Sequence, residues 1–328
     1  MIKKRLFCSL ILAGLFLPMS FCLAKIELDN DRDGLSDWEE KNVYGTDFQK
    51  LDTDGDSFED AAEIYNGFSP LKKGQVLLSS IGLAVPYTNE APDDNWTGPW
   101  KNACEESTMA MVEKYYLGQR TMTKVEAKAF MQMLFDKQNK VYGSNADSDS
   151  VRTAYLINNF SSYGAVIKNN PTVEEIKKEI NQRRPVITLH HGFDLKNKNI
   201  PFLATGSSYH MMAIVGYDDA KKEFITNDPG DRKEGKNHRY SYDLFMNTLH
   251  DFDFKTKKAN GPARVIFTYP KLVKTARSGR VFYINDGKSL QYITNPVAFV
   301  NHKWSWLAVN VVSDEWLRNF SVGANIDK

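Results

Sequence analysis

The sequence contains very little cysteine. Only three cysteines occur among its 328 residues, and two of them, Cys8 and Cys22, lie within the first 24 positions. The rest of the chain therefore carries a single thiol, Cys104, and cannot form an internal disulfide bond. In an exported protein a lone thiol is a liability unless it is buried or used in chemistry. This scarcity makes Cys104 the first candidate functional residue.

Long hydrophobic runs are also absent, apart from one near the N-terminus. Residues 6–17 form a nearly unbroken apolar stretch after a short basic start, but a membrane-spanning helix needs about 20 residues. Cys22 and Ala24 lie at the −3 and −1 positions of a small-residue cleavage site. We therefore predict a signal peptide over residues 1–24 and a secreted, periplasmic or cell-surface protein. A retained anchor or a lipid-modified Cys22 is the alternative, although Phe21 is unfavourable before a lipidation cysteine.

The chain has no excess of positive charge. It holds 42 basic and 41 acidic residues, and residues 1–24 contain three basic and no acidic ones, so 39 basic and 41 acidic residues follow the predicted signal. Nucleic-acid binding would require a clustered excess of lysine and arginine, so we expect no nucleic-acid partner. The length of 328 residues favours two or three domains.

Acidic residues are concentrated directly after the predicted signal. Residues 25–70 hold 14 acidic and four basic residues, and their spacing matches two EF-hand-type loops that begin 23 residues apart. Calcium explains this spacing, because the ion takes six to eight oxygen ligands and alternate carboxylates around a tight turn supply them. The expected side-chain ligands are Asp29, Asp31, Asp33, Asp37 and Glu40 in the first loop, and Asp52, Asp54, Asp56, Asp60 and Glu63 in the second.

Backbone carbonyls complete both loops in this interpretation. Leu35 and Phe58, at position 7, would supply them, whereas Ser57 replaces the glycine expected at the turn of the second loop. The stretches 29–40, 44–47 and 52–56 carry a resemblance to the bacterial thrombospondin type 3 repeats. In those repeats calcium is structural, so the resemblance implies a calcium-stiffened segment.

Cys104 is predicted to begin a helix. Apolar residues recur at helical spacing after it and a glycine ends the pattern, which predicts a helix over residues 104–117. A thiol in the first turn of a helix faces the positive end of the helix dipole, which favours the thiolate. The charges of Glu105 and Glu106 oppose that effect, so an imidazolium partner would have to outweigh them.

His210 lies in an apolar segment that is typical of a buried strand. A turn and a second strand follow, and this hairpin returns Asp228 to the neighbourhood of His210. Taken singly, Cys104 fits an inert buried thiol, His210 a core histidine, and Asp228 a turn residue before Pro229. Their combination favours catalysis, since a cysteine on a helix with histidine and aspartate on adjacent antiparallel strands is the papain arrangement.

Short motifs recur in order around these residues. They are Val85-Pro86-Tyr87, Pro99-Trp100, Ala103-Cys104-Glu105-Glu106, Arg184-Pro185-Val186-Ile187, Tyr209-His210, Gly216-Tyr217-Asp218-Asp219 and Thr226-Asn227-Asp228-Pro229-Gly230. From about residue 83 to residue 270 the chain thus resembles the exported relatives of the bacteriocin-processing cysteine peptidases, a papain-like family. The resemblance implies Cys104 as nucleophile and His210 as general base and acid. It implies that Asp228 orients the imidazole, with Asn227 as the alternative.

Glu90 departs from the pattern of that family. The family has a glutamine at this position after Val85-Pro86, and its amide helps to bind the oxyanion. An ionised carboxylate cannot donate a hydrogen bond and repels developing negative charge. Three interpretations stay open: Glu90 is held protonated, another donor serves, or the domain has lost its activity.

The remaining segments are expected to form scaffold. His190 and His191 are assigned to a cleft edge or a structural role, and Trp304, Trp306 and Trp316 to a small C-terminal core. Helices are predicted near 123–138, 148–162 and 172–183, strands near 185–190, 209–217, 222–227 and 264–269, and a hairpin from 280–284 and 290–294.

These inferences predict an α+β protein: a papain-like cysteine hydrolase domain with an N-terminal calcium-loop segment and a small C-terminal β-rich module. We expect a monomeric, calcium-binding cysteine peptidase that cleaves a peptide or amide bond of a peptide or protein substrate through a thioester on Cys104. The alternatives are a non-catalytic surface-binding or adhesion module and a transglutaminase-like acyltransferase, because hydrolysis and acyl transfer share the thioester. The expected boundaries are 1–24 for the signal, 25–70 for the calcium segment, 80–271 for the hydrolase domain and 275–328 for the C-terminal module.

Overall fold

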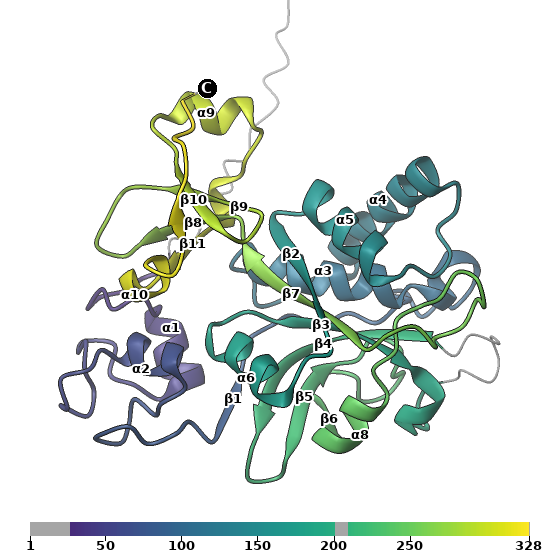
Figure 1. Cartoon of the computed structure of the whole chain (residues 1–328), viewed down its shortest axis with the longest axis horizontal. Coiled ribbons are helices and arrows are strands. Elements are labelled where there is room, and N and C mark those ends of the chain that lie inside the picture. Colours follow the sequence, from purple (N-terminus) through teal and green to yellow (C-terminus); the bar gives the residue numbers. More distant parts are fainter. Residues whose placement is uncertain (1–26, 201–208, 328) are drawn as a thin grey trace, which may run out of the picture.

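The computed structural model describes residues 27–200 and 209–327. The predicted signal peptide, residues 1–24, lies outside the described residues. Within the two described ranges, no helix is both long and apolar enough to cross a membrane. Figure 1 shows a large central sheet with helices, a segment of short N-terminal helices and a C-terminal module with its own small sheet.

A seven-stranded sheet forms the centre of the molecule (Figure 1). Its strands follow the order β2-β7-β3-β4-β5-β6, β1 pairs with the far end of β4, and all neighbours are antiparallel. β4 is buried along nearly its whole length, as its continuous apolar sequence predicts. Gly216 allows β1 to approach β4, because a Cβ atom there would lie 2.3 Å from the carbonyl oxygen of Ile81. The strands are β1 (Ser80–Gly82), β2 (Tyr163–Asn169), β3 (Val186–His191), β4 (Tyr209–Asp218), β5 (Glu223–Asn227), β6 (His238–Ser241) and β7 (Arg264–Pro270).

Helices pack against this sheet, and Figure 1 shows α3, α4 and α5 grouped beside β2 and β7. Capping boxes begin α4 and α6, because Thr123 and Thr172 exchange hydrogen bonds with glutamates three residues later. The predicted helices and strands of this domain are confirmed, whereas β1, β2, β6 and α8 are additional. The helices are α3 (Cys104–Tyr116), α4 (Lys124–Tyr142), α5 (Ser150–Phe160), α6 (Val173–Asn181) and α8 (Tyr242–Asn247).

The N-terminal acidic segment contacts both the sheet domain and the C-terminal module. A short helix follows each loop: α1 (Asp37–Glu39), continued by the π-helix Glu40–Tyr44, and α2 (Asp60–Asn66). Arg183 ties the first loop to the sheet domain, because it donates two 2.6 Å hydrogen bonds to Glu39 and one of 2.9 Å to the Gly34 carbonyl. On the other side, Asn66 Nδ2 donates to Glu315 Oε1 of the C-terminal module at 3.0 Å.

The C-terminal residues form a second sheet, in the order β11-β8-β9-β10-β12. The predicted hairpin is confirmed as β9 and β10. Trp316 is buried and Trp304 packs against the core of the module, as predicted, but Trp306 is 57% exposed and the prediction is wrong for it. The elements are β8 (Leu272–Thr275), β9 (Phe282–Asn285), β10 (Ser289–Tyr292), α9 (Pro296–Asn301), β11 (Val309–Val312), α10 (Asp314–Leu317) and β12 (Ser321–Val322).

Candidate active site

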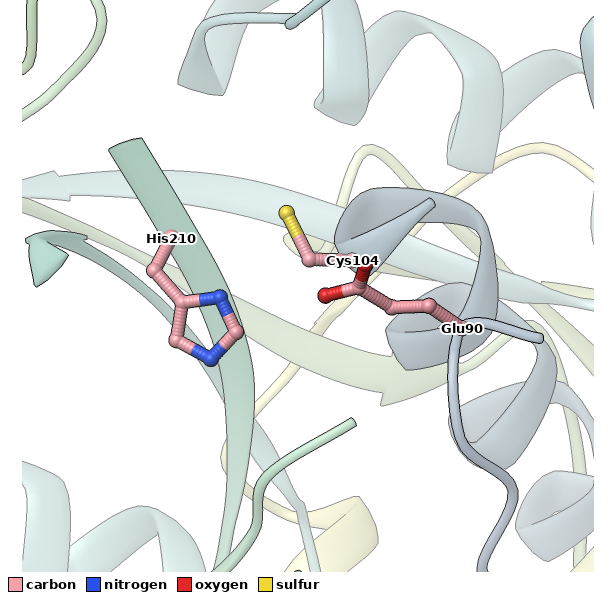
Figure 2. Close-up of side chains that lie close together, drawn as sticks. All are labelled: Glu90, Cys104 and His210. Atoms are coloured by element: carbon pink, nitrogen blue, oxygen red, sulfur yellow. The ribbon is translucent and has the colours of Figure 1, made fainter. Parts of the chain in front are cut away.

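Cys104 is the first residue of α3, and its side chain faces His210 and Glu90 (Figure 2). The thiol is buried, with 4% of the residue exposed, and its Sγ donates a hydrogen bond of 3.0 Å to Oε2 of Glu105. Burial raises the pKa of the Cys104 thiol well above its usual value, and the carboxyl groups of Glu105 and Glu90 raise it further. The expectation that the helix start favours the thiolate is therefore wrong for this arrangement, because desolvation and like charge outweigh the dipole.

His210 and Asp228 are brought together by the β4–β5 hairpin. His210 is the second residue of β4 and Asp228 directly follows β5, and the His210 Nε2–Asp228 Oδ1 distance is 2.7 Å. Burial opposes protonation of the imidazole, but the adjacent Asp228 carboxylate raises the pKa of His210 above its usual value. The structure thus places a hydrogen-bonded histidine–aspartate pair at the start of α3.

Further groups hold Asp228 in place. Tyr240 on β6 donates a hydrogen bond of 2.6 Å to Asp228 Oδ2, and the backbone N–H groups of Gly230 and Asp231 donate to Oδ1 at 3.1 and 3.3 Å. Burial alone would raise the pKa of Asp228, but His210 and then the Tyr240 hydroxyl lower it below the usual value. Asp228 therefore remains an ionised acceptor for the imidazole.

Glu90 lies at the same site, on the loop that leads from β1 to α3. Its backbone N–H donates to the Pro229 carbonyl at 3.1 Å, which places the residue beside the Asp228 turn. Gly230 leaves room for it, because a Cβ atom there would lie 3.1 Å from Glu90 Oε1 and 2.7 Å from His210 Cε1. Burial raises the pKa of Glu90 to about 8 although His210 acts to lower it. Of the open interpretations, this favours a protonated Glu90 at neutral pH.

Hydrogen bonds decide the roles of two further residues, Asn227 and His190. Asn227 turns its amide away from His210: Nδ2 donates to the carbonyls of Val85 and Pro86, both at 3.2 Å. His190, opposite His210 on β3, is fully buried, and its ring nitrogens contact the hydroxyls of Thr248 and Thr188 at 2.9 and 3.0 Å. His190 is therefore structural, and Asp228 rather than Asn227 contacts the imidazole.

Residues 83–258 of the chain match the Peptidase C39 like family. This range comprises 176 of the 328 residues (83 to 258 inclusive). The chain belongs to this family. Among solved structures it is similar to a protein from Bacillus anthracis described as a C39-like peptidase, with 14% identity and a TM-score of 0.38 over 57% of this chain and 96% of the other. No curated protein matches it.

As a member of the C39-like peptidases, the chain has a cysteine peptidase fold, and the family range contains Glu90, Cys104, His210 and Asp228. The sequence interpretation missed Tyr240, the support of Asp228. No local signal could have found it, because it lies on β6, which was not predicted, 12 residues after its partner.

The acidic loops show the geometry expected of cation ligands. Ligand oxygens of Asp29, Asp31 and Asp33 lie within 4.8 Å of one another, and so do those of the corresponding residues in the second loop, Asp52, Asp54 and Asp56. Asp37 and Asp60 instead accept hydrogen bonds inside the loops, from Asn30 and Thr53. Within these two loops, the buried carboxylate oxygens without a hydrogen-bond partner are Asp29 Oδ2, Asp31 Oδ2, Glu40 Oε2, Asp54 Oδ2 and Glu63 Oε2.

Proposed function

We propose that this chain is an active cysteine peptidase that cleaves a peptide or amide bond through a thioester on Cys104. The observation that carries the proposal is the 2.7 Å contact between His210 and Asp228, with the imidazole within 4.8 Å of the Cys104 sulfur. A nucleophile, a base and a group that orients the base are the components of acyl transfer by cysteine enzymes.

The reaction uses each residue in turn. His210 accepts the thiol proton as the Cys104 sulfur attacks the carbonyl carbon, and the resulting imidazolium is stabilised by Asp228. His210 then returns that proton to the leaving amine, and the thioester remains. Water attacks the thioester carbonyl with His210 again as base, and the carboxylic acid and free thiol are released. A protonated Glu90 donates a hydrogen bond to the oxyanion in both steps.

The raised pKa of Cys104 is compatible with this sequence of steps. The thiol starts neutral and hydrogen-bonded to Glu105, so proton transfer to His210 accompanies attack instead of preceding it. The buried thiol also fits the alternative, a binding module that keeps the fold without activity. Activity measurements on the intact protein separate the two.

The test is mass spectrometry of a peptide library incubated with the purified protein. Cleavage by the wild type, with an acyl adduct of the mass expected for a thioester, supports the proposal. Cys104→Ala should remove both signals, while Cys104→Ser tests whether the smaller, less acidic nucleophile retains any turnover. A library left intact by the wild type would instead favour the binding module, and a product joined to an added amine would show acyl transfer.

We further propose that the N-terminal loops bind structural calcium. The unpaired carboxylate oxygens of each loop support this, because buried acceptors that lack hydrogen bonds are costly without a cation. Asp29, Asp31 and Glu40 would contribute oxygens in the first loop, and Asp54 and Glu63 in the second. Affinities of about 0.1–1 mM are expected for an extracellular module. Titration calorimetry with calcium chloride checks the binding, and absence of heat would contradict it.

Export is the third part of the proposal. It rests on the basic and apolar pattern of residues 1–24 and on the single thiol that follows them. The intact mass of the protein recovered outside the cytoplasm should correspond to a chain that begins at Lys25. A retained N-terminus would contradict cleavage.

A further inference from the structure

The candidate active site combines three types of metal ligand. A carboxylate oxygen of Glu90, the sulfur of Cys104 and a ring nitrogen of His210 all lie within 4.8 Å of one another. The three come from different elements: the loop after β1, the first turn of α3, and β4. All three residues are buried, with 6%, 4% and 1% exposed, and Figure 2 shows their side chains pointing toward a common space.

We propose that this cluster is a zinc site, in which Glu90, Cys104 and His210 bind the ion. Zinc takes sulfur at about 2.3 Å and nitrogen or oxygen at about 2.0–2.2 Å in tetrahedral geometry, so neighbouring ligand atoms stand about 3.3–3.8 Å apart. Ligand atoms already within 4.8 Å of one another need only small side-chain movements to reach that separation. Three protein ligands leave a fourth position for water, as in open zinc sites.

The surroundings of His210 fit a metal ligand. Asp228 holds Nε2 at 2.7 Å, and Figure 2 shows the other ring nitrogen, Nδ1, on the side of Cys104 and Glu90. A carboxylate on the far nitrogen fixes the tautomer and orientation of zinc-binding histidines and raises their basicity. Tyr240 holds Asp228 in turn, at 2.6 Å. The support that orients His210 for catalysis thus also orients it toward a metal.

The charge around the cluster favours a divalent cation. Glu105 and Glu106 are both 2% exposed, and Glu105 Oε2 lies 3.0 Å from the Cys104 sulfur. Glu106 Oε2 is buried without a hydrogen-bond partner. When zinc binds, the protons of the Cys104 thiol and of the Glu90 carboxyl group leave for solvent, and the thiolate and the carboxylate together supply two negative charges, which balance the ion. The resulting cluster of zinc, thiolate and carboxylate has no net charge, which limits the cost of its burial.

Glu90 is the residue that distinguishes this site. A glutamine at the same position, as in the related peptidases that the sequence resembles, would offer zinc a neutral oxygen of much weaker affinity. The glutamate therefore supplies the anionic third ligand. If the proposed peptidase activity holds, zinc and substrate compete for Cys104, and zinc is a reversible inhibitor.

Cobalt spectroscopy tests the site without reference to activity. Untagged protein, freed of transition metals with a zinc-selective chelator in the presence of calcium, is titrated with cobalt chloride. A cobalt–thiolate charge-transfer band in the near ultraviolet, with one equivalent bound and its loss on addition of zinc, is the expected result. Titration calorimetry with zinc chloride should give the same stoichiometry.

Variants identify the ligands. Cys104→Ser should abolish the charge-transfer band, and Glu90→Gln should weaken zinc binding by at least the roughly 10- to 100-fold that loss of a partner behind a ligand costs. The matched control is Glu113→Gln, the same change at a buried position on α3, the helix that begins with Cys104; this variant should bind zinc as the wild type does. Circular dichroism confirms that each variant is folded.

Three outcomes would overturn the site: no charge-transfer band in the wild type, a band that survives Cys104→Ser, or equal zinc affinity in Glu90→Gln and the wild type. Zinc binding with the expected variant effects would support it even if the metal-free protein cleaves no peptide. That last result would refute only the proposed peptidase activity, so the two failures are distinguishable.

Discussion

Replacement of Glu90 by glutamine should change the pH dependence of activity rather than its maximum. The buried carboxyl group has a pKa of about 8 and donates to an oxyanion only below that pH. A glutamine amide of almost the same shape is a donor at every pH. The two proteins should therefore have similar kcat/KM near pH 6–7 and diverge as the pH rises.

The size of the divergence follows from the pKa. With a value of about 8, roughly 90% of Glu90 carries its proton at pH 7 and roughly 10% at pH 9. Loss of one oxyanion donor costs about 100- to 1000-fold in rate, so the ionised form contributes little. The ratio of kcat/KM for Glu90→Gln to that of the wild type should thus rise from near 1 at pH 7 to about 10 at pH 9. Removal of the Glu90 charge also lowers the pKa of Cys104 and of His210, so the titration of both groups is measured separately in each protein.

The assay uses one fluorogenic peptide, from about pH 5 to pH 9.5, with calcium present and a zinc-selective chelator added. Glu106→Gln is the control, because Glu106 is also buried, its pKa is likewise raised by burial, and it is not part of the Glu90–Cys104–His210 cluster. Parallel pH profiles for the wild type and Glu90→Gln would refute the role of Glu90 as an oxyanion donor. If neither protein were active at any pH, the binding-module alternative would be favoured.

Two further predictions follow from the buried charges. Alkylation of Cys104 by iodoacetamide should stay slow below pH 7 and accelerate only in alkaline solution, because burial and the Glu105 carboxyl group raise the pKa of the thiol. Fast alkylation at pH 5–6 would instead show that the thiolate is already formed. Arg183→Met should destabilise the protein by about 3 kcal/mol, since the buried Glu39 carboxylate loses its ion-pair partner and keeps only the hydrogen bonds from Ser36. The melting temperature should fall whether or not calcium is present. Arg239→Met, at a more exposed ion pair, should cost less than about 1 kcal/mol, and equal losses for the two variants would contradict the reasoning.

Much of the fold is predictable because its signals are local. Helical periodicity specifies α3 to α6, and capping side chains begin α4, α5 and α6. The strands β3, β4, β5 and β7 are continuous apolar or β-branched runs. The hairpin that brings Asp228 to His210 also follows from a short turn between two such runs. β1 and β6 are short, three and four residues, and have little pattern of their own, so only pairing with longer neighbours reveals them.

The sequence by itself determined which residues carry the chemistry. The spacing of the acidic residues in each loop and the order of Cys104, His210 and Asp228 are properties of the chain itself. Their protonation was decided by the tertiary structure. Burial and the nearby carboxyl group of Glu105 reverse the effect expected from the helix start on Cys104, and burial keeps the proton on Glu90. Tyr240 reaches Asp228 only after β6 has paired with β5. Desolvation and charge–charge interaction depend on distances in space, which residue order along the chain does not specify.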